Sequence, residues 1–454
     1  MSRLMGLLTA AVLAASVAVP GAVLATAGPI AVPLVVVGPV VARAASQPPT
    51  SAECQTDFGI ACYGPPDIQN QYDVTALLTG TPRIDGGGQT IVIFDAYGSP
   101  TIAQDLTTFD TAYGLPAPPS FQVYMPEGNV RDNYTKLPSP AFMNKRAQNQ
   151  IGWAYETTLD VEWAHAIAPG ASIALVVTPT AETQGVQGIP SLQNAQQWAL
   201  SNHIGMIWSN SWSTTEQSFH STASIGVLDR FYAQAAAQGV SAFFATGDSG
   251  VANTDKQGRL YPYPTVTYPP SSANVIAVGG TEIPTPVDTI TTYQPEAEWN
   301  DGYGAGGGGY SVVFAEPSYQ SGATISDPTG MRGVPDVSMN AALISSVLIY
   351  ESFDPQYGAG WTLIGGTSAA TPQWAAVAAL ANQYADRALG FLAPRLYQIY
   401  TNGSYASAFH DITVGDNSFG GITGYSAGSG WDAATGLGTP DVANLVAALK
   451  STSP

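Results

Sequence analysis

Short apolar runs alternate with longer amphipathic stretches through most of this chain. The apolar runs, which predict buried strands, cover residues 89–94, 171–177, 205–208, 240–245 and 274–278. Stretches with apolar residues at helical spacing lie between them and predict helices over 149–168, 191–201 and 228–238. Strands that alternate with helices are typical of an α/β fold with a doubly wound, mainly parallel sheet and helices on both faces. We expect one large domain over residues 76–450.

The first 75 residues depart from this alternation. An apolar run over residues 4–24 follows Arg3 and is succeeded by small residues, which predicts a secretory signal peptide within residues 1–44. Cleavage after Ala27 or after Ala44 fits the small residues there, and an uncleaved membrane anchor is the alternative. Residues 45–75 are polar and contain four prolines, so we expect a short N-terminal arm or linker.

The two cysteines of the chain, Cys54 and Cys62, lie within this arm. Their even number and short spacing favour a local disulfide formed in an oxidising compartment. No histidine or further cysteine nearby completes a tetrahedral zinc site. We therefore expect a secreted, extracellular protein whose disulfide fixes a terminal segment rather than the core.

Charged residues make up 10% of the sequence, and 14 basic against 33 acidic side chains give a net charge of −19 at pH 7. A chain so acidic is a poor ligand for nucleic acid. With every carboxyl protonated, the 14 basic residues and 4 histidines would carry at most 18 positive charges besides the amino terminus. Self-repulsion at low pH is then limited, so the composition suits an acidic medium. A secreted protein rich in small polar residues would show the same composition.

A serine stands in a small-residue setting where the next helix, over residues 368–389, is predicted to begin. The sequence Gly366-Thr367-Ser368-Ala369 is how a subtilisin-like hydrolase presents a nucleophilic serine, although capping serines at helix starts are common. The helix N-terminus would add backbone donors for an oxyanion. None of the histidines of the chain has the His-Gly-Thr-His context that supplies the base in such sites: His165, His203, His220 and His410.

Two carboxylates on the predicted helix 149–168 can replace the missing histidine. Glu156 and Asp160 are four residues apart and therefore share one helix face, where they are expected to share a proton. At pH ~4 roughly 0.3% of imidazole is neutral, whereas about a third of glutamate is ionised. A glutamate base therefore indicates chemistry in acid. Taken alone, such a pair is more often a solvated helix face.

A third acidic residue follows the predicted strand 240–245. Asp248 stands in Thr246-Gly247-Asp248-Ser249-Gly250, where a buried strand reaches the carboxyl edge of a parallel sheet. A protonated Asp248 could donate a hydrogen bond to a developing oxyanion, and low pH or burial would supply that proton. An ordinary turn residue is the plainer interpretation.

The order Glu156, Asp160, Asp248, Ser368 resembles the sedolisins, the serine-carboxyl peptidases of family S53. The resemblance spans residues 63–450 and includes further stretches at 209–212, 306–311, 333–338 and 431–440. It implies that Glu156 is the general base, Asp160 its partner, Asp248 the oxyanion-hole acid and Ser368 the nucleophile. It also implies a subtilisin-like fold, and it suggests that Asp95 and Trp212 extend the site. Many members carry a large folded prosegment between signal and catalytic domain, and we expect the roughly twenty to fifty residues available here to be too few for one.

A loop near the C-terminus resembles the calcium site of the same family. One structural Ca²⁺ would be bound by the carboxylates of Asp411 and Asp432, by the carbonyls of Ile412, Gly428 and Gly430, and by water. A glycine-rich turn is the alternative.

These observations lead to one principal hypothesis and two alternatives. The chain is expected to be a secreted serine-carboxyl endopeptidase that acts in acid on proteins or peptides, as a monomer without a membrane partner once the signal is removed. The alternatives are a tripeptidyl exopeptidase of the same family and a catalytically inactive, secreted peptide-binding protein.

Overall fold

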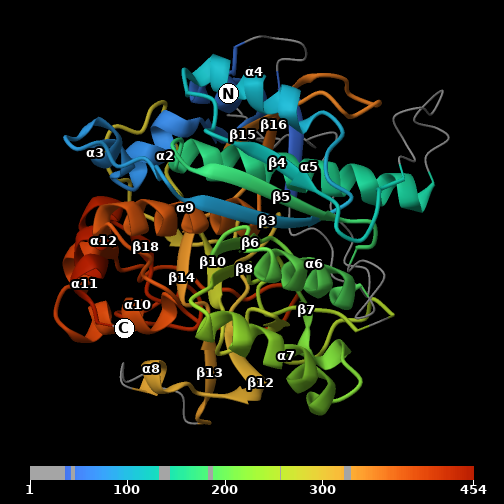
Figure 1. The fold of residues 1–454 in the computed structure, drawn as a ribbon, viewed down its shortest axis with the longest axis vertical. Coiled ribbons are helices and arrows are strands. Elements are labelled where there is room, and N and C mark those ends of the chain that lie inside the picture. The colour runs from blue at the N-terminus through green and yellow to red at the C-terminus, as the bar shows by residue number, and fades with distance from the viewer. Residues whose placement is uncertain are drawn as a thin grey trace, which may run out of the picture.

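A twisted, mainly parallel sheet crosses the middle of the molecule (Figure 1). The computed structural model describes residues 36–41, 47–131, 144–181, 188–255, 257–321 and 329–453. The parallel strands lie in the order β4 (Phe121–Tyr124), β5 (Ser172–Thr178), β3 (Thr90–Ala96), β6 (Ile207–Asn210), β8 (Ser241–Ala245), β10 (Ile276–Glu282) and β14 (Val337–Asn340). The short β11 (Ala297–Glu298) pairs antiparallel with β10. The doubly wound α/β fold predicted from the sequence is therefore confirmed.

Both faces of this sheet are buried, and strand β3 shows how the sequence brings this about. Side chains alternate between the two faces of a strand. Ile91 and Ile93 belong to one apolar core, whereas Val92 and Phe94 belong to another on the opposite face. Because both sets of positions are apolar, the strand needs a helical layer on each side.

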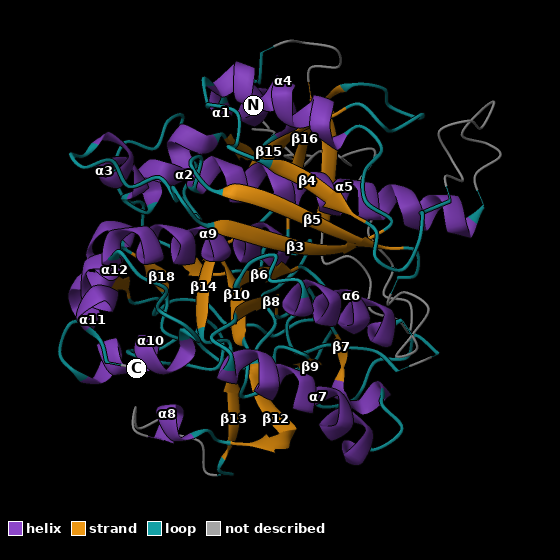
Figure 2. Cartoon of the chain, in the orientation of Figure 1, coloured by secondary structure: helices purple, strands orange, loops and turns teal. Residues whose placement is uncertain are grey.

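Helices cover the two faces as the doubly wound fold requires (Figure 2). α5 (Lys145–Ile167) and α9 (Thr367–Ala385) contribute to the first core, and α6 (Ile189–Ser201) and α7 (Thr222–Ala237) to the second. Helix α7 begins six residues before the predicted start because Ser221 and Ser224 form a capping box there. Helix α9 ends at Ala385 rather than near 389, where Asp386 adopts a left-handed conformation.

A second sheet of four strands packs beside the first and was not predicted. Its order is β1 (Val36–Val41), β16 (Gly360–Gly365), β15 (Ser345–Glu351) and β2 (Ala61–Tyr63). β16 pairs antiparallel with both β1 and β15, and β2 runs parallel to β15. Strand β1 falls within residues 1–44, where a signal peptide is expected. The apolar run at 4–24 and both proposed cleavage sites lie outside the described residues.

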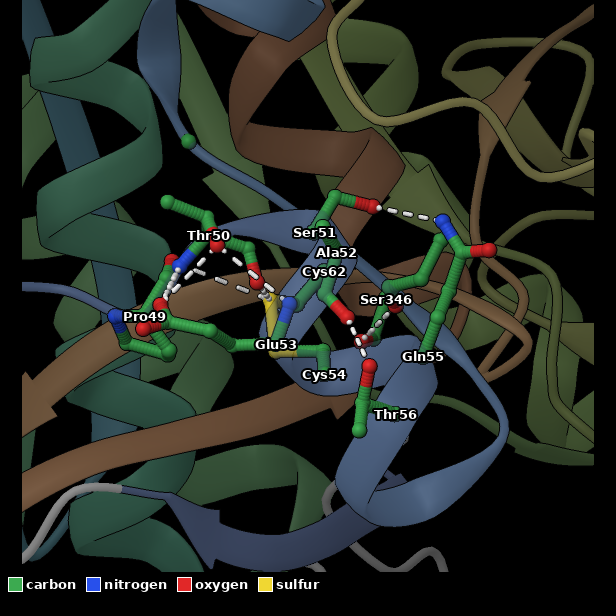
Figure 3. Close-up of a disulfide and its surroundings, with 12 residues drawn as sticks. Pro49, Thr50, Ser51, Ala52, Glu53, Cys54, Gln55, Thr56, Cys62 and Ser346 are labelled. Carbon is green, nitrogen blue, oxygen red and sulfur yellow. Dashed lines mark hydrogen bonds between the residues drawn. A yellow bond between two sulfur atoms is a disulfide. The ribbon is translucent and has the colours of Figure 1, made fainter.

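The segment expected to be an arm or linker is folded against the main domain. It forms α1 (Ser51–Phe58), strand β2 and α2 (Pro65–Gln71), followed by α3 (Val74–Thr79). Cys54 and Cys62 form a disulfide, and both are buried in the first apolar core (Figure 3). The disulfide joins two residues of the N-terminal segment, as expected, but the expectation that it lies apart from the core is wrong. The prolines of this segment predict a linker, but Pro65 instead begins helix α2, at a position where proline is favoured.

The remaining elements surround this framework. They are α4 (Ile102–Tyr113), β7 (Thr214–Thr215), the 3₁₀ helix η3 (Glu216–Ser218), β9 (Thr267–Tyr268), β12 (Gly309–Ala315), α8 (Ser318–Ser321), β13 (Met331–Val334), α10 (Ala393–Thr401), α11 (Tyr405–Ala408), β17 (Phe409–His410), β18 (Thr439–Pro440) and α12 (Val442–Ser451). Within the described ranges, no helix combines the length and the apolar character that crossing a bilayer demands.

Candidate active site

Ser368 lies at the start of helix α9, immediately after a sharp turn from strand β16. Gly366 has a φ of 112°, a conformation that favours glycine, and its N–H donates to the carbonyl of Ala341. A Cβ on Gly365 would lie 2.6 Å from the same carbonyl oxygen, so the chain needs two glycines to make this turn. The turn holds Ser368 in the first turn of the helix, where it is fully buried.

Glu156 faces Ser368 from the neighbouring helix α5. Helices α5 and α9 lie side by side on the same face of the sheet. The Glu156 carboxyl is fully buried, and the Ser368 hydroxyl is close enough to lower its pKa. Neither group has a partner with regular hydrogen-bond geometry, so the two are neighbours without a completed bond. Burial and the charges of Asp160 and Asp95 raise the pKa of Glu156 well above its usual range. Their effect is larger than the opposing effect of the Ser368 hydroxyl, which lowers this pKa.

Asp160 occupies the next turn of α5 and is also fully buried. Its Oδ1 accepts a hydrogen bond of 2.8 Å from the hydroxyl of Ser211, which follows strand β6. Burial and the charge of Asp95 raise the pKa of Asp160 well above its usual range. Because Glu156 and Asp160 raise one another's cost of ionisation, the pair retains a proton at pH values where an exposed carboxyl would lose it.

Asp95 forms a third buried carboxyl at the carboxyl end of strand β3. Burial raises its pKa to about 7, against the opposing effect of a nearby Thr157 hydroxyl. The indole N–H of Trp212 donates at 3.1 Å to the carbonyl of Phe94, next to Asp95, and not to the carboxyl itself. Of the two suggested extensions of the site, the structure therefore places Asp95 within the carboxyl cluster, whereas Trp212 contacts the backbone next to it.

Asp248 approaches the same helix start from strand β8. The N–H and the hydroxyl of Thr367 both donate to its Oδ1, at 2.8 and 3.0 Å. The Thr367 hydroxyl in turn accepts from the N–H of Gly247 at 3.1 Å. Burial raises the pKa of Asp248 to about 7, although the side chain keeps part of its surface open to solvent. Since both bonds from Thr367 end on Oδ1, a proton on Asp248 would reside on Oδ2.

The carboxyl edge of the parallel sheet explains why these residues meet. Asp95, Ser211 and Asp248 end or follow β3, β6 and β8, which are neighbours in the sheet. Helices α5 and α9 then bring Glu156 and Ser368 over that edge. The sequence alone gave no role to Thr367, Ser211 or Thr157. Thr367 directly precedes Ser368, Thr157 directly follows Glu156, and Ser211 lies within the stretch 209–212.

Histidine is absent from this cluster. His165 also lies on α5, but its Nε2 is 2.8 Å from the carbonyl oxygen of Pro116 and 3.3 Å from Asp110. The other histidines in the described part of the chain are not among the partners of Ser368 or Glu156. The fold and the site therefore define a subtilisin-like protein whose serine is paired with carboxyls rather than with imidazole.

Comparison with known proteins agrees with this class. A sequence model of the subtilase family matches residues 147–398. Kumamolisin from Bacillus sp. (strain MN-32) is 32% identical over 85% of this chain and 64% of that protein. Tripeptidyl-peptidase 1 from Homo sapiens is 31% identical over 65% of this chain and 51% of that protein. The chain thus spans less than two thirds of these relatives.

A solved structure gives a match of greater coverage. Pseudomonas sedolisin, a serine-carboxyl proteinase complexed with two molecules of pseudo-iodotyrostatin, superposes with a TM-score of 0.70 at 30% identity. The match covers 87% of this chain and 99% of that one. This chain belongs to the sedolisin family, and the expected resemblance and subtilisin-like fold are confirmed.

The five residues expected to bind calcium lie around one C-terminal loop. The N–H of Gly430 donates to both carboxyl oxygens of Asp411, and the N–H of Gly428 donates to Oδ2 of Asp432. Both acidic side chains therefore contact the segment that is expected to supply carbonyl ligands. Within the described ranges, no three His, Cys, Asp or Glu residues gather as a metal site. A calcium ion would depend on two carboxylates and on backbone oxygens, the hard ligands it prefers.

Proposed function

We propose that this chain is a secreted serine-carboxyl endopeptidase that hydrolyses proteins or peptides in acidic surroundings. One observation carries the proposal: the buried Glu156 carboxyl contacts the Ser368 hydroxyl at the start of α9, in a cluster without histidine. Membership in the sedolisin family and the peptidase names of the relatives support it.

Glu156 would act first as a general base. It takes the hydroxyl proton as Ser368 Oγ attacks the carbonyl carbon of the scissile peptide bond. Asp160, fixed by Ser211, keeps the remaining proton of the pair and orients Glu156. The tetrahedral oxyanion accepts hydrogen bonds from Oδ2–H of Asp248 and from the backbone N–H of Ser368.

The same proton then completes the cleavage. Glu156 donates it to the leaving nitrogen, the C–N bond breaks, and the amine product departs while an ester remains on Ser368. Water repeats the sequence on the ester: Glu156 accepts its proton, and returns it to Ser368 Oγ as the acid product leaves. The enzyme ends with the protonation state in which it began.

The acidic optimum follows from the two kinds of carboxyl. Glu156 must be able to accept a proton, so activity should rise as pH rises through the titration of the Glu156–Asp160 pair. Asp248 must be protonated to donate, so activity should fall as pH rises through its pKa of about 7. The titration of Asp248 therefore places the upper limit of the working range near pH 7.

The test is a pH-rate profile on a denatured protein substrate. The chain should cleave it below neutral pH, and Ser368→Ala should abolish cleavage. Glu156→Gln should lower kcat by about 10²–10⁴ because it removes the base, while near-UV circular dichroism stays unchanged. Activity that peaks above neutrality, or that survives Ser368→Ala, contradicts the proposal.

A tripeptidyl exopeptidase is a second candidate, supported by the similarity to tripeptidyl-peptidase 1. Mass spectrometry of the products from an unlabelled peptide separates the two. Successive tripeptides from the amino end would replace the endopeptidase proposal, and internal fragments would support it.

We also propose that the loop of Asp411, Ile412, Gly428, Gly430 and Asp432 binds one structural Ca²⁺. The contacts of Gly428 and Gly430 with the two aspartates support this, because they hold both carboxylates around the backbone segment that would supply the carbonyl ligands. The ion would stabilise the fold and take no part in the chemistry.

A further inference from the structure

Strand β1 lies directly on the strand that leads into Ser368. Val36 pairs with Gly365, and Val41 pairs with Trp361. Gly365 stands three residues before Ser368, so the two Cα atoms are at most about 10 Å apart. Because β15 covers the other edge of β16, strand β1 occupies the remaining edge of β16.

The direction of β1 matches that of a substrate's leaving-group side. The pairing is antiparallel, so the Val36 end is nearest Ser368 and the chain recedes from the nucleophile toward Val41. In a peptide that Ser368 cuts, the residues after the scissile bond must likewise lead away from the nucleophile. Main-chain pairing on an exposed strand edge accepts many sequences, which suits a peptidase.

The pairing of β1 is close but interrupted. A Cβ on Gly38 would lie 2.9 Å from the carbonyl oxygen of Leu363 and 3.2 Å from Leu343, so glycine permits the approach. The register shifts between Val37 and Val40, where Pro39 has no N–H to donate. A strand with a break in its hydrogen-bond ladder covers the edge without being bound as firmly as a regular strand.

We propose that the outer edge of β16 binds the leaving-group side of an extended peptide, and that β1 is an internal occupant that competes with it. The inference rests on the proposed peptidase function and adds a way in which that function would be regulated. Signal cleavage after Ala27 would keep β1 on the chain, whereas cleavage after Ala44 would remove it and free the edge.

The first test uses the full chain with Gly38→Glu, which places a bulky charge against Leu363. The matched control is Gly226→Glu on α7, where a Cβ would meet no atom within 4 Å. For a peptide with four residues after the cut bond, KM should fall several-fold in Gly38→Glu but not in the control. For a substrate with only a chromophoric amine after that bond, KM should not change. Equal effects on both substrates, or a KM for the long peptide that does not fall, overturn the proposal.

The second test does not depend on catalysis. In a Ser368→Ala background, which cannot cut added peptide, amide hydrogen exchange over 361–365 should accelerate with Gly38→Glu. A synthetic peptide copying residues 36–41 should slow it again. The milder Gly38→Ala should act in the same direction if the glutamate variant does not fold. If neither variant changes this exchange, the proposal fails even in an active peptidase. If exchange responds but the wild type cleaves nothing, the peptidase function fails and the strand edge stands.

Discussion

Replacing Asp248 by asparagine should separate the role proposed for Asp248, that of oxyanion-hole acid, from the role proposed for Glu156, that of base. Thr367 donates two hydrogen bonds to Oδ1 of Asp248, and an asparagine can accept them only through its carbonyl oxygen. Its amide nitrogen must then take the place of Oδ2, the atom that carries the proton in the acid. Asp248→Asn therefore keeps a donor aimed at the same point but frees that donor from titration.

The pKa of about 7 sets the size of the effect. One unit above it, about a tenth of Asp248 remains protonated, and kcat/KM of the wild type should fall about tenfold for each further pH unit. In Asp248→Asn this falling limb should move to higher pH. Asp248→Ala, the matched control, loses the donor at every pH, so its kcat should lie about 10²–10³ below that of the wild type at pH values below 7, where the wild-type donor is protonated.

The assay is initial-rate cleavage of a fluorogenic peptide from pH 3 to 9, with circular dichroism to confirm folding. Two results would refute the reasoning. The falling limb of Asp248→Asn could coincide with that of the wild type, which would assign it to the Glu156–Asp160 pair. Alternatively, Asp248→Asn could lose as much activity as Asp248→Ala, which would mean that a neutral donor at this position does not suffice.

Three further predictions concern stability. Removing the disulfide by Cys54→Ser and Cys62→Ser together should lower the free energy of unfolding by about 2–3 kcal/mol in urea denaturation, since it closes a loop of eight-residue separation; an unchanged midpoint would contradict this. The pKa of Glu351 rises from 4.5 to about 8, mainly by burial, so folding takes up a proton and thermal stability should fall as pH rises through this window. Glu351→Gln should flatten that slope in calorimetry, and an unaltered slope would exclude Glu351. Chelation of Ca²⁺ should lower the Tm of the wild type but not that of Asp432→Ala. Equal shifts in Tm would mean that this loop does not bind calcium.

The carboxyl cluster also predicts how catalysis depends on Ser211, which lies 51 residues from Asp160 in the sequence. Asp160 is fixed by Ser211, so Ser211→Ala should reduce kcat more than it raises KM, since it leaves Ser368 and Asp248 in place. The effect should be smaller than that of Glu156→Gln. A change confined to KM would mean that Ser211 contacts substrate instead of orienting the pair.

Local patterns were sufficient for the main framework. The alternation of apolar runs with amphipathic stretches predicted the parallel sheet, because strands buried on both faces are apolar throughout and helices repeat every 3.6 residues. The spacing of Glu156 and Asp160 placed both on one helix face for the same reason. Boundaries shifted where capping decided them, as Ser221 shows for α7.

Contacts distant in sequence could not be obtained in this way. The second sheet joins β1, β2, β15 and β16, and its pairing depends on partners nearly 300 residues apart and more. The composition of the segment around Cys54, with its prolines and polar residues, predicts a linker, whereas its burial depends on what packs over it. Composition describes a residue's own preference and not its tertiary neighbours.

The sequence by itself therefore determined which groups are proposed to react: a serine in a glycine turn, a carboxyl pair on one helix face, and an aspartate after a buried strand. Only the tertiary structure decided that these groups meet at one edge of the sheet, that Asp95 joins them, and that Thr367 fixes which oxygen of Asp248 can carry a proton. The physical reason is that secondary structure follows local periodicity. The pKa of a buried carboxyl instead follows from the charges and the solvent that the whole fold brings to it or excludes.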